Sequence, residues 1–307
     1  NMRFGCHENT LKVQFEQRRF QPIGAELPES ERGWRPPFCL RSNETPSKVV
    51  CGYATPGASF SLGACDDNQV WIPDAGGTAY ARWNFEDPKR QQALIESLPN
   101  LTIAERITVG SNAEALLDAG LLSPSQLVDV AEGLIRAGDR WSQSIAFNWI
   151  SNWQENILTD EAQEALTTWA KERLADIPEK FRTVHFDPTE KEADTLHRRT
   201  VLGFLTDVAQ DTAARTKMAD LGSAWLDASA GSLDLPESFA GMAMRLYAEQ
   251  RSDEAFERLT RALSTETDPS RRRTLLRGLS AVRGASSERL WSSINDLSLR
   301  SNEKTSV

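Results

Sequence analysis

A change in hydrophobic periodicity near residue 88 constrains the fold of this chain more than any other feature of its sequence. Residues 11–16 alternate between apolar and polar side chains, which is the pattern of a half-buried strand. Along residues 127–135 the apolar positions instead recur every three or four residues, which is typical of an amphipathic helix. With 307 residues the chain has room for two domains at about 150 residues each. We therefore predict a β domain over residues 1–85 and an α-helical domain over residues 86–307.

Several short segments in the first part have the composition of β-strands. Residues 38–40 and 48–53 flank a polar turn at residues 43–47, which is a hairpin signal. Residues 59–62 and 69–72 add two more short strands, and Gly and Pro separate the segments. Strands this short and this closely spaced predict a small Ig-like β-sandwich.

Helix start and stop signals divide the second part. Capping boxes are predicted at residues 102–105 and 123–126, and Gly120 and Gly138 are placed to end helices. Three further helical runs are expected to open at Asp187-Pro188, Leu235-Pro236 and Asp268-Pro269. The signals give roughly nine to eleven helices joined by short loops. Because no strict repeat is visible, we predict an irregular HEAT-like array of stacked helix pairs.

The charge distribution limits the class of partner. A net charge of −9 argues against nucleic-acid binding, which needs a basic face to displace counterions from phosphates. No stretch approaches the ~18 apolar residues of a membrane span, so none is predicted. Residues 1–90 carry 11 basic and 11 acidic residues, whereas residues 91–307 carry 24 basic and 33 acidic ones. This acidic excess either lines a concave surface that favours a cationic ligand or forms a solvated outer face.

The sequence lacks the residues of the common hydrolytic sites. A zinc-peptidase site needs two His one helical turn apart together with Glu, and the chain has only His7, His185 and His197. His7-Glu8 begins like that motif, but Leu11 stands where the second His would be and a strand is predicted there. No Gly-x-Ser-x-Gly elbow and no phosphate-binding glycine loop occurs. We predict no catalytic residue and no metal ligand in this chain, and no cofactor bound by it.

The four cysteines all fall in the predicted β domain, at Cys6, Cys39, Cys51 and Cys65. Four Cys in a small sandwich indicate two disulfides, for which three connectivities exist. One pairing joins Cys39 to Cys51 across the predicted hairpin and leaves Cys6 with Cys65. Another joins Cys51 to Cys65 and Cys6 to Cys39 and fits a sandwich equally well. The remaining interpretation is four reduced thiols in a cytoplasmic protein.

Five segments, in order along the chain, resemble the C-terminal half of the M1-family zinc aminopeptidases. Residues 71–83, Trp-Ile-Pro-Asp-Ala-Gly-Gly-Thr-Ala-Tyr-Ala-Arg-Trp, resemble the family segment that joins a β-sandwich to the helical C-terminal domain. The other segments lie at residues 11–24, 34–39 and 186–199 and, as a pair of short late matches, at residues 268–271 and 297–303. In the sandwich and the joint, the positions that match family motifs are Gln17, Arg19, Phe20, Trp34, Trp71, Gly76, Gly77, Tyr80 and Arg82. Asp74, Ala79 and Ala81 depart from the family pattern.

The resemblance implies a sandwich followed by an ERAP1-like helical C-terminal domain that encloses the peptide cavity of a zinc domain. Its implied partners are an N-terminal catalytic domain of the same polypeptide and peptide substrates. Zinc and aminopeptidase activity would belong to the parent protein and not to this chain. Cysteines at matching places imply the exported bacterial type, in the periplasm, with a cytoplasmic location as the alternative.

Two further expectations concern the extent and the class of the chain. Residue 1 is Asn and no apolar signal-peptide core follows it, so the start is expected to be cut. The family's helical domain continues past the match at Glu303, so its last helices are expected to be missing. An alternative of a different class is a stand-alone helical-array scaffold that binds a protein or peptide partner.

Overall fold

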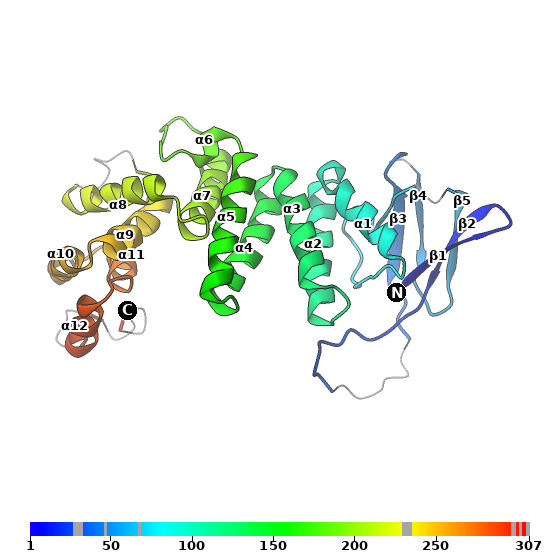
Figure 1. The fold of residues 1–307 in the computed structure, drawn as a ribbon, viewed down its shortest axis with the longest axis horizontal. Helices are drawn as coiled ribbons and strands as arrows, with labels where there is room; N and C mark the ends of the chain where they lie inside the picture. Colours follow the sequence, from blue (N-terminus) through cyan, green and yellow to red (C-terminus); the bar gives the residue numbers. More distant parts are fainter. Residues whose placement is uncertain are drawn as a thin grey trace. The chain divides into compact units, whose positions relative to one another are not determined.

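The protein forms small antiparallel sheets followed by an array of helices, as predicted from the sequence (Figure 1). The computed structural model describes residues 1–26, 33–45, 48–66, 69–228, 235–295, 299–300 and 303–304. The predicted turn at residues 43–47 and the family-like positions between 297 and 303 lie partly outside the described residues. The chain divides into two compact units, residues 1–150 and residues 151–307. The domain boundary predicted between residues 85 and 86 stays a prediction.

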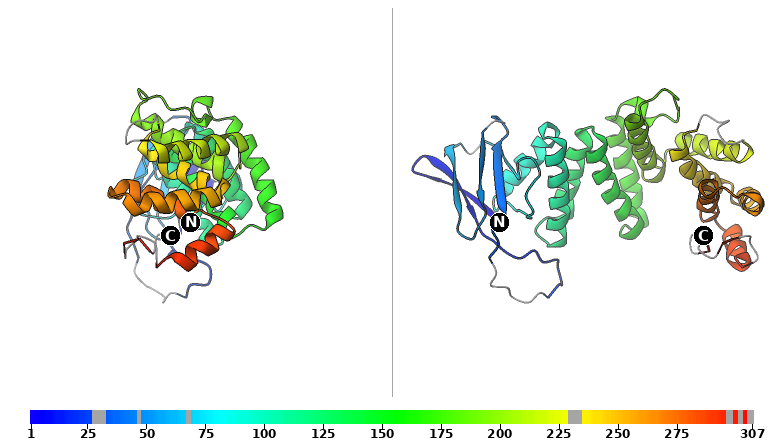
Figure 2. Two further views of the ribbon diagram at one scale, coloured as in Figure 1. Left: turned by 90° about the vertical axis from the view of Figure 1, so that its left-hand side faces the viewer. Right: turned by 180° about the vertical axis from the view of Figure 1, so that it is seen from behind.

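The described strands form two three-stranded antiparallel sheets, which Figures 1 and 2 show as two layers. The strands are β1 (Met2–His7), β2 (Thr10–Phe15), β3 (Pro37–Ser42), β4 (Val49–Tyr53), β5 (Ser59–Ala64) and β6 (Trp71–Pro73). One sheet has the strand order β1-β2-β5 and the other β4-β3-β6. The chain therefore passes from one sheet to the other and back, as in a sandwich, and the strands do not form one meander.

The core of the sandwich follows the alternation predicted for β2. Leu11 and Val13 are 0% exposed, and Phe15 packs its ring 5.5 Å from that of Phe38 on β3. Between β1 and β2 the chain turns at Glu8 and Asn9, whose φ angles are 50° and 59°. Two consecutive positive φ angles define a type I′ hairpin turn. His7 therefore ends a strand and Glu8 begins the turn, so this dipeptide does not begin a metal-binding helix.

The structure joins Cys6 to Cys65 and Cys39 to Cys51, so the pairing across the hairpin is the one observed. Cys39 and Cys51 are directly opposite in the β3–β4 register, with their Cα atoms 4.1 Å apart. Both neighbours of Cys39 on β3, Phe38 and Leu40, are buried against the core. Because side chains alternate along a strand, the Cys39–Cys51 bridge lies on the outer face of its sheet.

Twelve α-helices and one short 3-10 helix (Leu98–Asn100) lie in the described residues, against the nine to eleven predicted. In the first unit they are α1 (Pro88–Ser97), α2 (Ile103–Asp118), α3 (Pro124–Arg136) and α4 (Arg140–Asn156), and the division into units falls inside α4. In the second unit they are α5 (Asp160–Ala175), α6 (Glu179–Arg182), α7 (Glu192–Asp207), α8 (Thr212–Asp227), α9 (Glu237–Gln250), α10 (Ser252–Thr265), α11 (Pro269–Leu279) and α12 (Ala285–Ser293). The four-residue helix α6 is too short to have a periodicity that a sequence reveals.

The helix ends follow the predicted capping signals, with one correction. Both predicted capping boxes are present, at α2 and α3, and Gly120 and Gly138 follow these helices with φ angles of 67° and 77°. Asp268 caps α11 through its side chain. Asp187-Pro188, however, does not open a helix, because the Asp187 carboxylate accepts hydrogen bonds from Thr189 and closes a separate turn. The helix that was expected there, α7, begins only at Glu192.

The second unit is built on a close crossing of α8 and α9. A Cβ atom at Gly222 of α8 would collide with the backbone of Ala243 on α9. Phe239, Met244 and Tyr247 of α9 are 0% exposed, so this helix is the buried centre of the unit. Figure 1 shows α8, α10 and α11 around it.

Reduction of the Cys39–Cys51 bridge should destabilise the first unit. Its 12-residue separation corresponds to about 3 kcal/mol in the loop-entropy model. We expect the Cys39→Ala, Cys51→Ala double variant to lose roughly that free energy of unfolding, measured by urea denaturation without reductant. Under reducing conditions the difference from the wild type should shrink sharply. An equal difference with and without reductant would show that packing, and not the covalent bond, is responsible.

Candidate functional site

A buried ion pair holds the sheet of β3 to helix α2. Arg41 of β3 donates to both carboxylate oxygens of Glu105, at 2.5 and 2.6 Å, and the two side chains are 10% and 1% exposed. Glu105 is also the third residue of the α2 capping box and accepts from the backbone N–H of Thr102 at 3.0 Å. Burial raises the pKa of the Glu105 carboxyl, but the hydrogen bonds from Arg41 and Thr102 outweigh it and hold the pKa at about 2. The pair is therefore ionised at any physiological pH.

The segment after β6 is a tight loop built around Asp74. Its Oδ1 accepts from the backbone N–H of Thr78 at 2.8 Å and of Ala79 at 2.7 Å. Asp74, Gly76 and Gly77 all have positive φ, of 53°, 80° and 67°. Gly77 must be glycine for a second reason, since a Cβ there would lie 2.8 Å from Thr108 Oγ1 and 3.0 Å from the Ala104 carbonyl of α2. The loop is thus folded tightly onto the first turns of α2.

From Gly77 the chain runs along α2 and is fixed to it again one turn further on. The side-chain amide of Asn112, which is 2% exposed, accepts from the Trp83 backbone N–H at 2.9 Å and donates to the Trp83 carbonyl at 2.7 Å. Arg82 donates to Ser111 Oγ at 2.9 Å. Tyr80 lies between these two anchor points and is 97% exposed. The structure therefore holds a tyrosine ring in solvent on a short backbone that is fixed at both ends.

The loop that follows β2 reaches the other end of the same helix. The Gln17 side chain accepts from the Trp34 backbone N–H at 2.8 Å and donates to the Trp34 carbonyl at 3.1 Å, so it binds the two arms of the loop together. Ile23 donates its backbone N–H to the carbonyl of Asp118, the last residue of α2, at 2.8 Å.

The loop, the Tyr80–Trp83 stretch and the end of α2 together surround a groove of about 440 Å³. Six of the nine motif positions line it: Gln17, Arg19, Phe20, Trp34, Tyr80 and Arg82. We call it the motif groove. Its base is apolar, with Phe15, Phe38 and Trp83 from the core, and its charged lining residues are three arginines and one glutamate. The remaining motif residues have other places, since Trp71 is buried in the core and Gly76 and Gly77 form the tight loop.

Sequence reasoning missed part of the groove. Leu116, Ala119 and Leu121 line it from the end of α2, yet they lie about 100 residues after the first motif strand and carry no motif. Asn112, which fixes the Trp83 backbone, was not singled out either. The one local signal of this wall of the groove is Leu121, an apolar residue directly after the helix-ending Gly120. In the structure its side chain is exposed.

The described residues do not fit a catalytic zinc ion. Among them no group of three or more His, Cys, Asp or Glu side chains could hold a metal. His7 ends a strand, whereas His197 lies buried in α7 with its ring 4.1 Å from that of Phe181. Over the same described part of the chain, no helix is long and apolar enough to cross a membrane.

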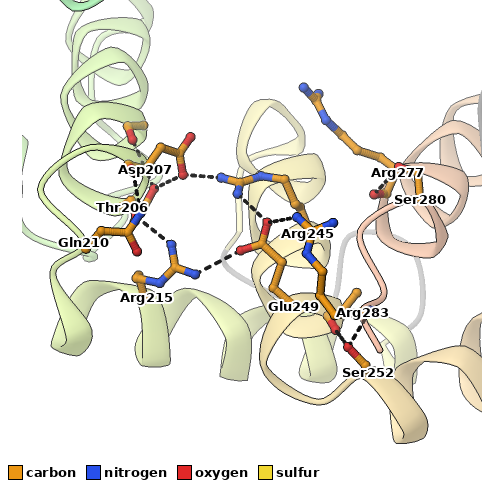
Figure 3. A network of polar contacts seen from close by, with 12 residues as sticks. Thr206, Asp207, Gln210, Arg215, Arg245, Glu249, Ser252, Arg277, Ser280 and Arg283 are labelled. Atoms are coloured by element: carbon orange, nitrogen blue, oxygen red, sulfur yellow. Dashed lines mark hydrogen bonds and ion pairs between the residues drawn. The ribbon is translucent and has the colours of Figure 1, made fainter. Parts of the chain in front are cut away.

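The second unit contains a polar network centred on Arg245 and Glu249 (Figure 3). Arg245 of α9 pairs with Asp207 and, at 2.9 Å, with Glu249, which also accepts from Arg215 at 3.0 Å. Arg283 approaches Glu249 to 3.6 Å. Burial lowers the pKa of Arg245, but the two carboxylates outweigh it and leave the pKa raised. The ion pairs connect α7, α8 and α9, which indicates a structural role.

Small antiparallel sheets, a helical array and a joint folded onto the first long helix define a β-then-α chain with a helical-array C-terminal region. The family model of the ERAP1-like C-terminal domain matches residues 71–307. The chain therefore belongs to the ERAP1-like C-terminal domain family, and it contains a C-terminal domain related to those of the M1 aminopeptidases. None of the curated proteins matches the chain.

The Arg41–Glu105 pair should make the first unit sensitive to acid. A carboxyl whose pKa falls from 4.5 to about 2 on folding contributes about 3 kcal/mol above pH 5, and this is lost as the pH falls toward 2. Glu105→Gln should remove that acid dependence and, by leaving Arg41 buried without its charged partner, cost about 3–5 kcal/mol at pH 7. Urea denaturation at several pH values measures both effects.

Glu86→Gln is the matched control for that experiment. Glu86 pairs with Arg3 at 2.6 Å, but the Arg3 side chain is 68% exposed, so we expect a change of at most about 1 kcal/mol. A Glu105→Gln variant as stable as this control would contradict the role given to the buried pair.

Two substitutions of Asp74 should change the free energy of unfolding in opposite directions. Its Oδ2 is buried without a hydrogen-bond partner in the described residues, while Oδ1 accepts two backbone N–H groups. Asp74→Asn keeps the acceptor and removes the buried charge, so we expect a gain of about 1 kcal/mol in unfolding free energy. Asp74→Ala removes the acceptor and should cost about 1–3 kcal/mol. Equal stability of the two variants, measured in urea, would contradict this account.

Proposed function

We propose that the chain is the non-catalytic C-terminal region of an M1-type metallo-aminopeptidase, in which it encloses the peptide cavity of a separate zinc domain. The observation that carries the proposal is the match of residues 71–307 to the ERAP1-like C-terminal domain. The described residues offer no set of side chains for zinc, which is consistent with a metal centre held by another part of the parent polypeptide.

The proposed division of labour gives each part of the chain a mechanical role. The sheets, in the proposed domain of residues 1–85, act as a spacer of fixed length, because two disulfides and a packed apolar core make them rigid. The helical array, in the proposed domain of residues 86–307, supplies a wall of the chamber that admits the ends of peptides. Zinc, held by the catalytic domain, would activate the water that hydrolyses the peptide bond.

The cysteines support the proposed compartment. Two disulfides are present in the structure, and such bonds persist in oxidising compartments and are rare in the cytosol. They support an exported protein of the bacterial type, located in the periplasm.

Two preparations test the proposed function. We expect the 307-residue chain to hydrolyse no aminoacyl-anilide, with or without added zinc, and the polypeptide encoded by the whole reading frame to hydrolyse it. Chelation should abolish that activity, and added zinc should restore it. Turnover by the 307-residue chain itself would refute the proposal. A complete reading frame without zinc-dependent turnover would favour the stand-alone scaffold instead.

A further inference from the structure

The motif groove has the features of a preformed binding surface. Tyr80 is 97% exposed, Trp34 is 65% exposed and Phe20 is 41% exposed, and all three line the same groove. Aromatic rings are the side chains that most often anchor an interface, because they bury a large area with few rotatable bonds. Exposing three of them on one concave face costs hydration free energy unless a partner covers them.

The backbone that carries these rings is already fixed. Tyr80 lies between the Asp74-centred loop and the Asn112–Trp83 hydrogen bonds, and Gln17 fixes the Trp34 backbone on both sides. A partner that binds here therefore orders little of the chain, and most of the contact energy remains available for affinity. These hydrogen bonds hold the backbone of both aromatic residues in place before any partner binds.

The charge of the groove defines the chemistry of the partner. Its lining carries Arg18, Arg19 and Arg82 against Glu16 alone, in a chain whose net charge is −9. Glu16 is already hydrogen-bonded to Arg18 at 3.0 Å. Within the described residues Arg82 has a hydroxyl partner, Ser111, and no carboxylate partner. A carboxylate at the Arg82 guanidinium would complete a charge-assisted, bidentate contact.

We propose that the motif groove is the docking surface for an extended segment of the peptidase domain of the same polypeptide. This segment places an apolar side chain between Tyr80 and Trp34 and a carboxylate against Arg82. The inference rests on the proposed function, and it adds the surface and the chemistry by which the two parts recognise each other. A second copy of this chain is a poorer occupant, because a groove that binds a different face of its own copy forms a heterologous interface, which closes into a ring only at particular rotations and otherwise generates open chains of molecules.

The three tyrosines of the chain provide a direct test without mutation. Tyr80 is 97% exposed, Tyr53 is 56% exposed and lies outside the groove lining, and Tyr247 is 0% exposed. In the 307-residue chain, tetranitromethane should nitrate Tyr80 and Tyr53 readily and Tyr247 hardly at all. In the full-length polypeptide Tyr80 should react at least about tenfold more slowly, while the rate at Tyr53 stays within about twofold. Mass spectrometry of the digested protein measures all three rates.

Variants then test the contacts in the full-length polypeptide. Tyr80→Ser and Arg82→Glu should each speed proteolytic cleavage between the peptidase domain and this chain by about tenfold or more. Trp141→Ser is the matched control, because Trp141 is also an aromatic residue of the first unit, 52% exposed and stacked with an arginine, but it lies outside the groove lining. The unfolding midpoint of the 307-residue chain should not change with Tyr80→Ser.

The outcomes separate the inference from the proposed function. Zinc-dependent peptidase activity of the full-length protein, with Tyr80 protected and the control variant unaffected, supports both. The same activity with Tyr80 nitrated as fast as in the 307-residue chain overturns the inference and leaves the proposed function standing. Absence of peptidase activity in the full-length protein overturns both. Concentration-dependent protection of Tyr80 in the 307-residue chain alone would assign the groove to a second copy and overturn the inference.

Discussion

One carboxylate, that of Glu105, joins three parts of the first unit. It pairs with Arg41 of β3, completes the capping box of α2, and accepts a backbone N–H from Gly76 in the joint at 3.3 Å. Because both members of the pair are buried, their hydration has been given up, and only the close two-bond geometry compensates for it. A hydrophobic contact would allow the sheet to slide along the helix, whereas the two hydrogen bonds between Arg41 and Glu105 do not. The sheet, the first long helix and the segment between them therefore have one relative position within the unit.

With its start fixed in this way, α2 orders the surface around it. Gly77 packs against its first turns, Trp83 is fixed by Asn112 in its middle, and Ile23 is bonded to Asp118 at its end. The loop after β2 and the Tyr80–Trp83 stretch are far apart in the chain, but both are attached to this one helix. The groove between them is thus a consequence of the helix length and of three separate attachments. Loss of any attachment would displace one wall of the groove relative to the others.

Local features of the fold could be read from the sequence, because they depend on neighbouring residues. The alternation in β2 and the capping boxes of α2 and α3 need only three or four residues each, and all of them are present. Glu105 was therefore recognised as a capping residue, but its partner Arg41 lies 64 residues away and left no local signal. The motif residues of the groove were identified by resemblance, while Leu116, which also lines it, and Asn112, which fixes the Trp83 backbone, were not. The error at Asp187-Pro188 has a different origin, because the contact that decides for a turn is local: the Asp187 carboxylate accepts from the backbone N–H and the hydroxyl of Thr189.

Arg82 of the motif groove differs from the arginines around Glu249 in its partners, and this contrast bears on where a partner binds. Glu249 accepts from Arg215 and Arg245 and lies near Arg283, so these three cations face a carboxylate within the fold. Among the described residues the partner of the Arg82 guanidinium is a hydroxyl, and the groove also holds the exposed rings of Tyr80 and Trp34. The network joins three arginines to the two carboxylates of Asp207 and Glu249, so it does not use up the acidic excess of residues 91–307. A basic, aromatic groove in an otherwise acidic chain is therefore the face that an acidic and apolar partner segment would select.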